Sequence, residues 1–340
     1  MKINRQELIA ALEAVRPGLA SKEIVEQSMS FVFRRGRVYT YNDVVAISHP
    51  CAKELAGAVQ SKELHTLLTR STDDEVDIEI SDNEMLIAGK RTKAGISLQT
   101  DITLPLEEVI GKKQWIELPA GFTAAVKFVL FSASTDMTKP WSTGVHSDGA
   151  RVETCDNFRL TRYTLSRRTN TKVKGDLLIP AAACAELVKY DPSHYVVDDN
   201  WIHFTNEKDV QFSCRVIVDT FPDLSPFIDR KWKYKIEFHE DTVAILDRAS
   251  VFLLAEKNGH PSVNVKVTSG RMVISAKGTA GWFEETVRVK ASKEGFEFTI
   301  NPQALKDMLP LLKDCELSDD GSVLKFVGDN FIHCCATVVE

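Results

Sequence analysis

The most constraining feature of this 340-residue chain is a series of markers that occurs three times in the same order. Each series begins with a two-residue turn between strand-like runs, at Arg35-Gly36, Asp148-Gly149 and Ser269-Gly270. Each continues with a candidate helix start, near Gln60, Pro180 and Asn301. Each then reaches a second turn, whose residues tolerate the positive φ of hairpins, at Asp82-Asn83, Asp199-Asn200 and Asp320-Gly321. The chain is therefore predicted to consist of three similar units.

The repeat divides the chain into three predicted domains, residues 1–112, 113–230 and 231–340, each close to the commonest domain size. Apolar residues recur at helical spacing twice in each unit, and the clearest such stripe runs from Leu305 to Leu312. Runs rich in branched and aromatic residues lie between these helices, which favours strands. We therefore expect an α+β fold in which each domain packs two helices on antiparallel sheets.

The expected elements can be placed by residue number. First helices are predicted near Leu8–Val15, Phe122–Leu130 and Val243–Leu253, and second helices near Leu64–Leu68, Cys184–Val188 and Leu305–Leu312. Strands are predicted at Phe31–Tyr41, Val76–Ile80, Trp201–Thr205, Val210–Val218, Val263–Val267 and Phe331–Val339. Pro222 and Pro226 restrict the backbone between the second and third units. Segment 221–227 is therefore predicted to be an extended connector.

Composition argues against several classes of protein. No apolar run approaches the roughly 18–20 residues that cross a membrane, and no signal-peptide pattern occurs, so we expect a cytoplasmic protein. The seven cysteines are dispersed and form no CxxC pair, which predicts reduced thiols instead of a disulfide framework or a zinc site. Cys334 and Cys335 should face opposite sides of a strand, with one thiol buried.

Catalytic chemistry finds little support in the sequence. The eight histidines form no HExxH pattern, and neither a glycine-rich phosphate motif nor a GxSxG motif occurs. Three acidic pairs could bind a metal or act as acid and base: Asp73-Asp74, Asp198-Asp199 and Asp319-Asp320. Two of the three fall in the repeated second turn, where aspartate is favoured for backbone reasons. We therefore predict a protein that is not an enzyme and that uses no metal or cofactor.

Five short motifs follow one another across the three repeats. They are Cys155-Asp156-Asn157-Phe158-Arg159-Leu160, Leu178-Ile179-Pro180 before a helix, Phe221-Pro222-Asp223, Arg248 with Glu256-Lys257, and Phe298-Thr299-Ile300-Asn301 before the last helix. None of them is specific alone. Their order and spacing, on top of a threefold repeat, resemble the β subunit of bacterial DNA polymerase III, the DNA sliding clamp, in a divergent form.

The resemblance implies a fold and a function. A chain of that family has three clamp domains and forms half of a ring, and two chains close head to tail around double-stranded DNA. The ring is a processivity factor that tethers the DNA polymerase and other replication proteins after a clamp loader has placed it on DNA. The formal net charge of −6 fits such a ring, because encirclement does not require tight adhesion.

A weakly cationic bore is expected to face the DNA backbone. Its candidate residues lie on the polar faces of helices or in nearby loops: Arg5, Lys22, Lys62, Arg70, Lys127, Lys189, Arg248 and Lys306. Lys22, Lys62 and Lys189 match family positions that meet the backbone. Each cation taken alone could equally be an ordinary solvated surface charge. The run Ala181–Ala183 departs from the family, which often has basic residues there, so this part of the bore should grip DNA weakly.

The family binds a short peptide of each partner protein in a cleft between its second and third domains. By resemblance, the cleft here would be formed by Cys155, Asn157, Phe158, Arg159, Leu160, Pro222, Phe227 and Val338. Leu160, Pro222 and Phe227 could instead serve only as packing between domains. Phe158 and the ending Cys334 to Glu340 differ from the family pattern, which predicts altered peptide specificity.

Ring closure would need complementary surfaces at the two ends of the chain. The resemblance suggests Leu104, Leu106, Phe252, Leu253, Glu256 and Lys257. Phe252 and Leu253 could also be core residues. Two hypotheses therefore remain open: a homodimeric ring that encircles DNA, and a non-encircling scaffold or decoy that binds replication proteins.

Overall fold

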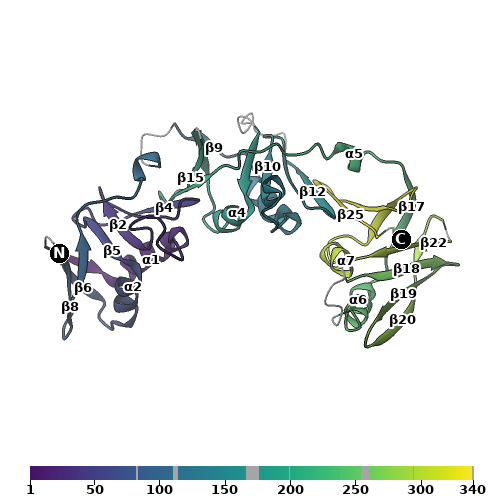
Figure 1. The fold of residues 1–340 in the computed structure, drawn as a ribbon, viewed down its shortest axis with the longest axis horizontal. Coiled ribbons are helices and arrows are strands. Elements are labelled where there is room, and N and C mark those ends of the chain that lie inside the picture. Colours follow the sequence, from purple (N-terminus) through teal and green to yellow (C-terminus); the bar gives the residue numbers. More distant parts are fainter. Residues whose placement is uncertain are drawn as a thin grey trace. The chain divides into compact units, whose positions relative to one another are not determined.

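The computed structural model describes residues 1–81, 83–109, 114–165, 176–198, 200–253, 261–293 and 295–338. They form two compact units, one from residues 1–127 and 166–218 and the other from residues 128–165 and 219–340 (Figure 1). The units divide the second repeat between them. The predicted domain boundaries at residues 112 and 230 stay predictions.

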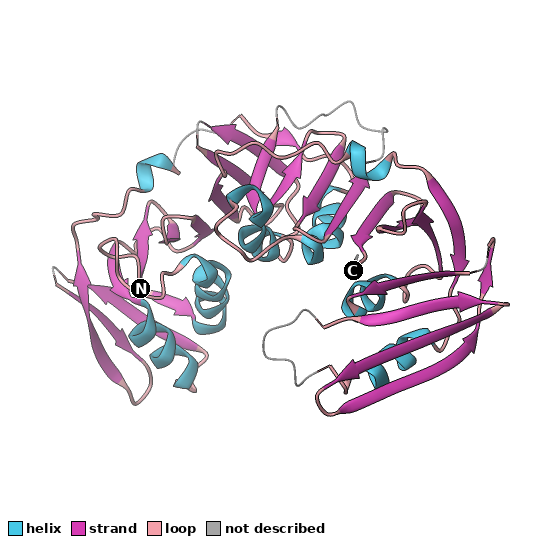
Figure 2. Cartoon of the chain, turned by 45° about the vertical axis from the view of Figure 1, so that its right-hand side comes forward, coloured by secondary structure: helices cyan, strands magenta, loops and turns pink. Residues whose placement is uncertain are grey.

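Unit 1 is built on a sheet in the order β1-β6-β7-β8-β5-β2-β3-β4-β16-β15-β14-β9. The strands of this sheet are β1 (Lys2–Asn4), β2 (Ser30–Arg34), β3 (Arg37–Tyr41), β4 (Val45–Pro50), β5 (Gly57–Gln60), β6 (Glu75–Ile80), β7 (Glu84–Ala88), β8 (Lys93–Gln99), β9 (Ile116–Glu117), β14 (His194–Asp198), β15 (Trp201–Thr205) and β16 (Gln211–Arg215). Strand β13 (Leu177–Pro180) also belongs to unit 1 but lies outside this sheet. Its helices are α1 (Arg5–Val15), α2 (Ser61–Arg70), most of α3 (Phe122–Val129), α4 (Ala181–Leu187) and the short 3-10 turns η1 (Arg16–Gly18) and η2 (Leu106–Glu108). Figures 1 and 2 show α1 and α2 side by side against the strands.

Unit 2 has strands in the order β10-β11-β12-β25-β24-β23-β17-β21 and a second sheet, β20-β19-β18-β22. The strands are β10 (Gly144–Ser147), β11 (Arg151–Cys155), β12 (Arg159–Thr164), β17 (Trp232–Glu237), β18 (Val263–Thr268), β19 (Arg271–Gly278), β20 (Gly281–Arg288), β21 (Lys290–Ala291), β22 (Phe296–Ile300), β23 (Asp314–Ser318), β24 (Val323–Val327) and β25 (Phe331–Ala336). The helices are α5 (Ser225–Ile228), α6 (Thr242–Ser250), α7 (Pro302–Met308), η3 (Leu130–Ser132) and η4 (Pro140–Thr143). Helices α6 and α7 contact each other, and α6 lies on β18, β19 and β20.

The α+β prediction is confirmed, since helices cover sheets whose described pairings are antiparallel. Repetition extends to single hydrogen bonds. The Thr40 hydroxyl donates to the Val15 carbonyl at 2.5 Å, and the Thr154 hydroxyl donates to the Val129 carbonyl at 2.6 Å. Each bond fastens the end of the first helix of its repeat to the following strand hairpin.

The core of the third repeat shows why its helices form. Leu305 and Met308 of α7 and Ile245 and Leu246 of α6 are buried in one cluster with the inner faces of the strands. Asn301 caps α7, because its side-chain oxygen accepts a hydrogen bond from the backbone nitrogen of Gln303 at 2.9 Å. None of the helices in the described ranges combines the length and the apolar character that a bilayer crossing demands.

Two local predictions are wrong. The connector is not extended throughout, because Ser225–Ile228 forms the short helix α5, with Pro226 in its first turn, where a proline loses no helical hydrogen bond. Cys334 and Cys335 do face different clusters, but both are buried, at 2% and 1% exposure. Both faces of β25 are covered at these positions, because Cys335 packs in the cluster that contains Leu305 and Met308, and Cys334 packs in the cluster that contains Leu160 and Leu224.

Candidate functional site

A cavity of about 380 Å³ lies in unit 2, where β12 pairs with β25. Strands and strand ends contribute Cys155, Leu160, Val323, Cys334 and Ala336. The connector and α5 contribute Pro222, Leu224 and Phe227. The segment before β10 contributes Lys139 and Trp141, and the turn between β11 and β12 contributes Asp156, Asn157, Phe158 and Arg159, while Arg230 and Ser322 complete the lining.

The floor of the cavity is apolar and is formed by residues of paired strands. Cys155, Leu160 and Cys334 sit in one cross-strand row, since Leu160 is paired with both cysteines. These residues pack with Leu224 and Val323 in a buried cluster. Phe158 and Phe227 line the same cavity but keep 57% and 48% of their surface exposed. Exposed aromatic side chains beside an apolar floor are suited to enclosing an apolar segment of a partner.

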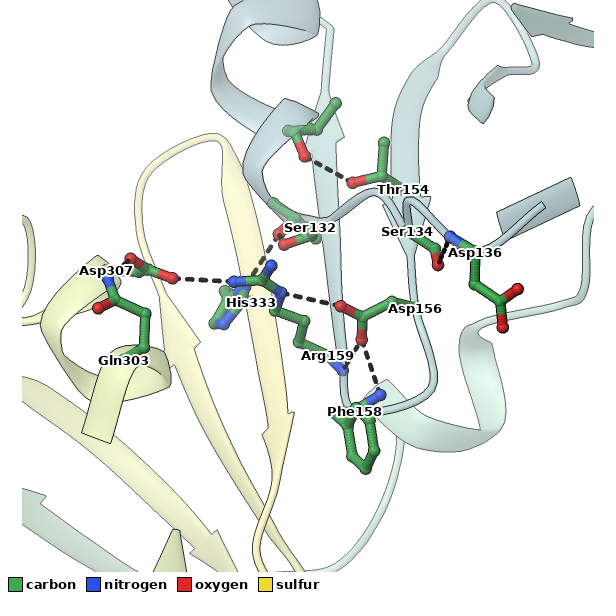
Figure 3. A network of polar contacts seen from close by, with 12 residues as sticks. Ser132, Ser134, Asp136, Thr154, Asp156, Phe158, Arg159, Gln303, Asp307 and His333 are labelled. Carbon is green, nitrogen blue, oxygen red and sulfur yellow. Dashed lines mark hydrogen bonds and ion pairs between the residues drawn. The ribbon is translucent and has the colours of Figure 1, made fainter. Parts of the chain in front are cut away.

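Charged side chains at the cavity are held in fixed positions. Arg159 lies between two carboxylates: its Nε donates to Asp156 at 3.0 Å, and its Nη1 donates to Asp307 of α7 at 2.9 Å (Figure 3). Lys139 donates to the Asn157 side-chain oxygen at 2.7 Å. Arg230 donates to the Ser322 hydroxyl at 2.7 Å. Three cations and one carboxylate therefore line the cavity. The charge of Arg159 is offset by its two carboxylate partners, so Lys139 and Arg230 are the cations that favour an acidic occupant over a basic one.

A buried polar row supports Arg159 from behind. The Ser132 and Thr161 hydroxyls are 2.6 Å apart, and Thr161 contacts Nδ1 of His333 at 2.9 Å (Figure 3). His333 is fully buried, and its Nε2 has no hydrogen-bond partner among the described residues. Burial, together with the charge of Arg159, lowers the pKa of His333 to about 3, so the ring is neutral at physiological pH.

The two thiols of the cavity are not reactive groups. Burial raises the pKa of Cys155 to about 12, with the nearby carboxylates of Asp156 and Glu153 adding to the shift. Burial likewise raises the pKa of Cys334 to about 12. Both thiols are therefore protonated near neutral pH and act as small apolar side chains. In the part of the chain that the structure describes, no group of three or more His, Cys, Asp or Glu side chains could hold a metal ion.

No family model and no curated protein matches the sequence. Similarity to known proteins is instead found in the structure. A DNA polymerase III β chain from Streptococcus pneumoniae superimposes with a TM-score of 0.86 at 18% identity, covering 100% of this chain and 99% of that one. The chain has the sliding-clamp fold. The β subunit from Pseudomonas aeruginosa (TM-score 0.84, 15% identity, 100% of both chains) and the sliding clamp from Bacillus subtilis (0.83, 17%, 100% and 98%) agree.

With the clamp fold in view, the residues predicted for the peptide cleft can be compared with the cavity. Seven of the eight line it, and Val338 does not: its backbone nitrogen donates to the Thr299 carbonyl of β22 at 2.6 Å. The sequence prediction did not name nine lining residues, namely Lys139, Trp141, Asp156, Leu224, Arg230, Ser322, Val323, Cys334 and Ala336. Leu224 lies in the predicted connector 221–227, which also contains Pro222, and Ala336 lies in the predicted strand Phe331–Val339.

The cations predicted for the bore fall into two groups. Lys22, Lys62, Arg70 and Lys127 are exposed in unit 1 and form no ion pair with the residues that the structure describes. Three others have a carboxylate partner: Lys189 with Glu186 at 2.8 Å, Arg248 with Glu285 at 2.7 Å, and Lys306 with Asp247 at 3.1 Å. Their positive charge is partly offset before any phosphate approaches.

Arg5 is a correction. The residue is only 9% exposed, and its guanidinium donates to the backbone carbonyls of Asp73 and Leu68, at 2.5 and 3.0 Å. It closes the C-terminal end of α2, whose last carbonyls lack helical partners, and in this conformation it offers no surface to DNA.

Of the four predicted dimer-interface residues that the structure describes, three are buried within the chain itself. Leu104 and Leu106 are 5% and 0% exposed in a cluster with Tyr41 and Trp201, so the structure assigns them to the interior of unit 1. Leu253 belongs to the core of unit 2. Phe252 is partly exposed and stacks on Phe283 at 6.1 Å. Glu256 and Lys257 lie outside the described residues.

Proposed function

We propose that this chain is a DNA polymerase processivity factor: a homodimeric ring that encircles double-stranded DNA and tethers the polymerase and other replication proteins. The observation that carries the proposal is the match of its whole length to DNA polymerase III β subunits. The chain would act without catalysis and without a cofactor, in the cytoplasm, on DNA of any sequence.

Charge supports a sliding contact over a tight one. Four exposed cations of unit 1, Lys22, Lys62, Arg70 and Lys127, are available to phosphates, while the candidates of unit 2 are paired with carboxylates. Contacts to the phosphate backbone carry no sequence information, so such cations would hold DNA at any position. With a net charge of −6, the outer surface would repel DNA that is not encircled.

The 380 Å³ cavity is the proposed docking site for the polymerase and the clamp loader. An apolar floor with three fixed cations suits a short peptide that carries leucine or phenylalanine beside an aspartate or glutamate. Phe158 and the ending Cys334 to Glu340 differ from the family pattern in sequence. The peptide preference of the cavity is therefore proposed to differ as well.

Dimerisation is proposed through strand edges. Strand β20 ends its sheet, and its exposed side chains include Trp282 at 72% exposure. Strand β8 pairs with β5 only through Leu98 and Gln99, so its earlier residues lack a second neighbour within the described ranges. Exposed strand edges are the surfaces through which two sheets from different chains join. A head-to-tail contact of this kind closes a ring when its rotation divides the circle.

Sedimentation equilibrium tests the assembly. We expect a species of twice the 38.0 kDa chain mass at micromolar concentration. Trp282→Glu should shift the population toward the monomer, because it places a charge in the proposed contact. The exposed Met137→Glu, on a loop of unit 2, is the matched control and should leave the dimer intact. A wild-type chain that remains monomeric would instead favour a non-encircling scaffold.

A further inference from the structure

The chain contains two joints between successive repeats, and they have the same backbone plan. Joint one, in unit 1, is the pairing of β4 with β16, where Val45 lies opposite Cys214. Joint two, in unit 2, is the pairing of β12 with β25, where Arg159 lies opposite Cys335. The cavity described above lies at joint two.

The turns that lead into the two joints match in detail. The Asn42 side chain accepts hydrogen bonds from the backbone nitrogens of Val44 and Val45. Asp156 accepts the same pair of bonds from Phe158 and Arg159. One residue earlier, Tyr41 therefore corresponds to Cys155.

Strand register extends the correspondence to the other side of each joint. Trp201 lies opposite Arg215 at the start of β15, and Val323 lies opposite Ala336 at the start of β24. Three pairs of positions are thus equivalent: Tyr41 with Cys155, Trp201 with Val323, and Arg215 with Ala336. The second member of each pair lines the cavity of joint two.

At joint one the same three positions hold large, interlocked side chains. The Tyr41 and Trp201 rings are 6.0 Å apart, and the Arg215 guanidinium lies 4.7 Å from the centre of the Trp201 ring. Arg215 also donates to the Tyr41 hydroxyl at 3.3 Å. Glu108 accepts hydrogen bonds from both the Trp201 indole and Arg215, each at 3.1 Å. Trp201 is only 4% exposed.

We propose that Tyr41, Trp201 and Arg215 form a plug that closes joint one to partner peptides, so that each chain has one peptide cleft instead of two. A peptide at joint one would have to displace a buried indole that is stacked on a cation and hydrogen-bonded to Glu108. At joint two, thiol, isopropyl and methyl groups replace the phenol, indole and guanidinium, and the space remains open. This inference rests on the proposed function of the cleft at joint two.

The test counts binding sites in variants that exchange the two joints. Trp201→Val with Arg215→Ala gives joint one two of the three residues of joint two, and Val323→Trp with Ala336→Arg does the reverse. The probes are 4-fluorophenol, followed by fluorine NMR, and a fluorescein-labelled Asp-Leu-Asp-Leu-Phe peptide, followed by anisotropy. Far-UV circular dichroism and the melting temperature establish that each variant is folded.

We expect one site for each probe on the wild-type chain, two on the Trp201→Val/Arg215→Ala variant, and none on the Val323→Trp/Ala336→Arg variant. Arg215→Ala alone, which leaves the buried indole in place, should keep one site. A milder double variant is available if Trp201→Val/Arg215→Ala does not fold. Arg215→Ala with Glu108→Gln keeps Trp201 but removes its cation and weakens its hydrogen-bond acceptor, and it should raise the number of 4-fluorophenol sites above one.

The outcomes separate this proposal from the proposed function. A folded Trp201→Val/Arg215→Ala variant that gains no site for either probe would overturn the plug, as would a wild-type chain with two 4-fluorophenol sites. A different result would separate the two proposals. If 4-fluorophenol binds at one site on the wild type, at two on Trp201→Val/Arg215→Ala and at none on Val323→Trp/Ala336→Arg, while the peptide binds to none of them, the plug is upheld and peptide tethering at joint two is contradicted.

Discussion

His333 is a buried histidine whose neutrality is linked to folding. In the folded chain, burial and the nearby charge of Arg159 lower the pKa of the His333 ring to about 3. An unfolded chain binds a proton there at about pH 6.5. Below that pH the unfolded state binds a proton that the folded state does not bind. The contribution of His333 to the free energy of unfolding is therefore fully present above about pH 6.5 and decreases toward pH 3.

A pH series on His333→Gln tests this linkage. Between pH 6.5 and pH 5 the wild type should lose about 2 kcal/mol more stability than the variant, because each pH unit of unmatched protonation costs up to about 1.4 kcal/mol. Glutamine retains a polar group for Thr161 but does not titrate. Urea unfolding of both proteins at the two pH values gives the difference. Equal losses would show that His333 does not control the acid side of the stability profile.

Some single residues could not be assigned from sequence. Arg5 looks like a surface cation on an amphipathic helix, but its acceptors, the carbonyls of Leu68 and Asp73, come from a distant part of the chain. Leu106 was predicted at an interface and is buried in the chain's own core. In both cases the deciding contact is non-local, which residue type and periodicity do not reveal.

Helices and hairpin turns were predictable where local chemistry decides them. Ser269 and Gly270 adopt φ values of 50° and 70°, as the predicted two-residue turn requires. Asn301 caps α7 as expected. The connector was mispredicted because Pro226 can open a helix as readily as interrupt an extended strand. The cavity itself depends on which side chains meet across β12, β24 and β25, and only part of that set was predicted.

Helix α4 carries no cation that could bind a phosphate. Ala182 and Ala185 are its exposed positions, and its neighbour Lys189 is paired with Glu186. If α4 faces the duplex, this stretch adds almost no electrostatic attraction. The ring would then move along DNA with little resistance from this part of its bore.

Lysines on α4 should therefore strengthen the grip on DNA. Ala182→Lys and Ala185→Lys should each steepen the slope of log K against log salt by about 0.9 for every new phosphate contact. Fluorescence anisotropy on a labelled duplex between 50 and 200 mM salt measures the slope. Thr268→Lys, an exposed position on β18, is the matched control and should change it less. Identical slopes for all three variants would argue that α4 does not face DNA.

The proposed ring would hold DNA by confinement instead of adhesion. The full-length match to clamps from three bacteria was found at 15–18% identity, a range in which the fold persists although most side chains differ. The repeat pattern predicted that fold because backbone markers, the turns and helix starts, survive such divergence better than the residues that contact a partner.

The most direct test is retention on DNA before and after a single cut. The protein, loaded onto a nicked circular plasmid and separated from free chains by gel filtration, should remain with the DNA in 0.5 M salt. It should then be released when a restriction enzyme makes the plasmid linear, because a closed ring can slide off an end. Retention that is unaffected by linearisation, or no retention on the circle at all, would contradict encirclement.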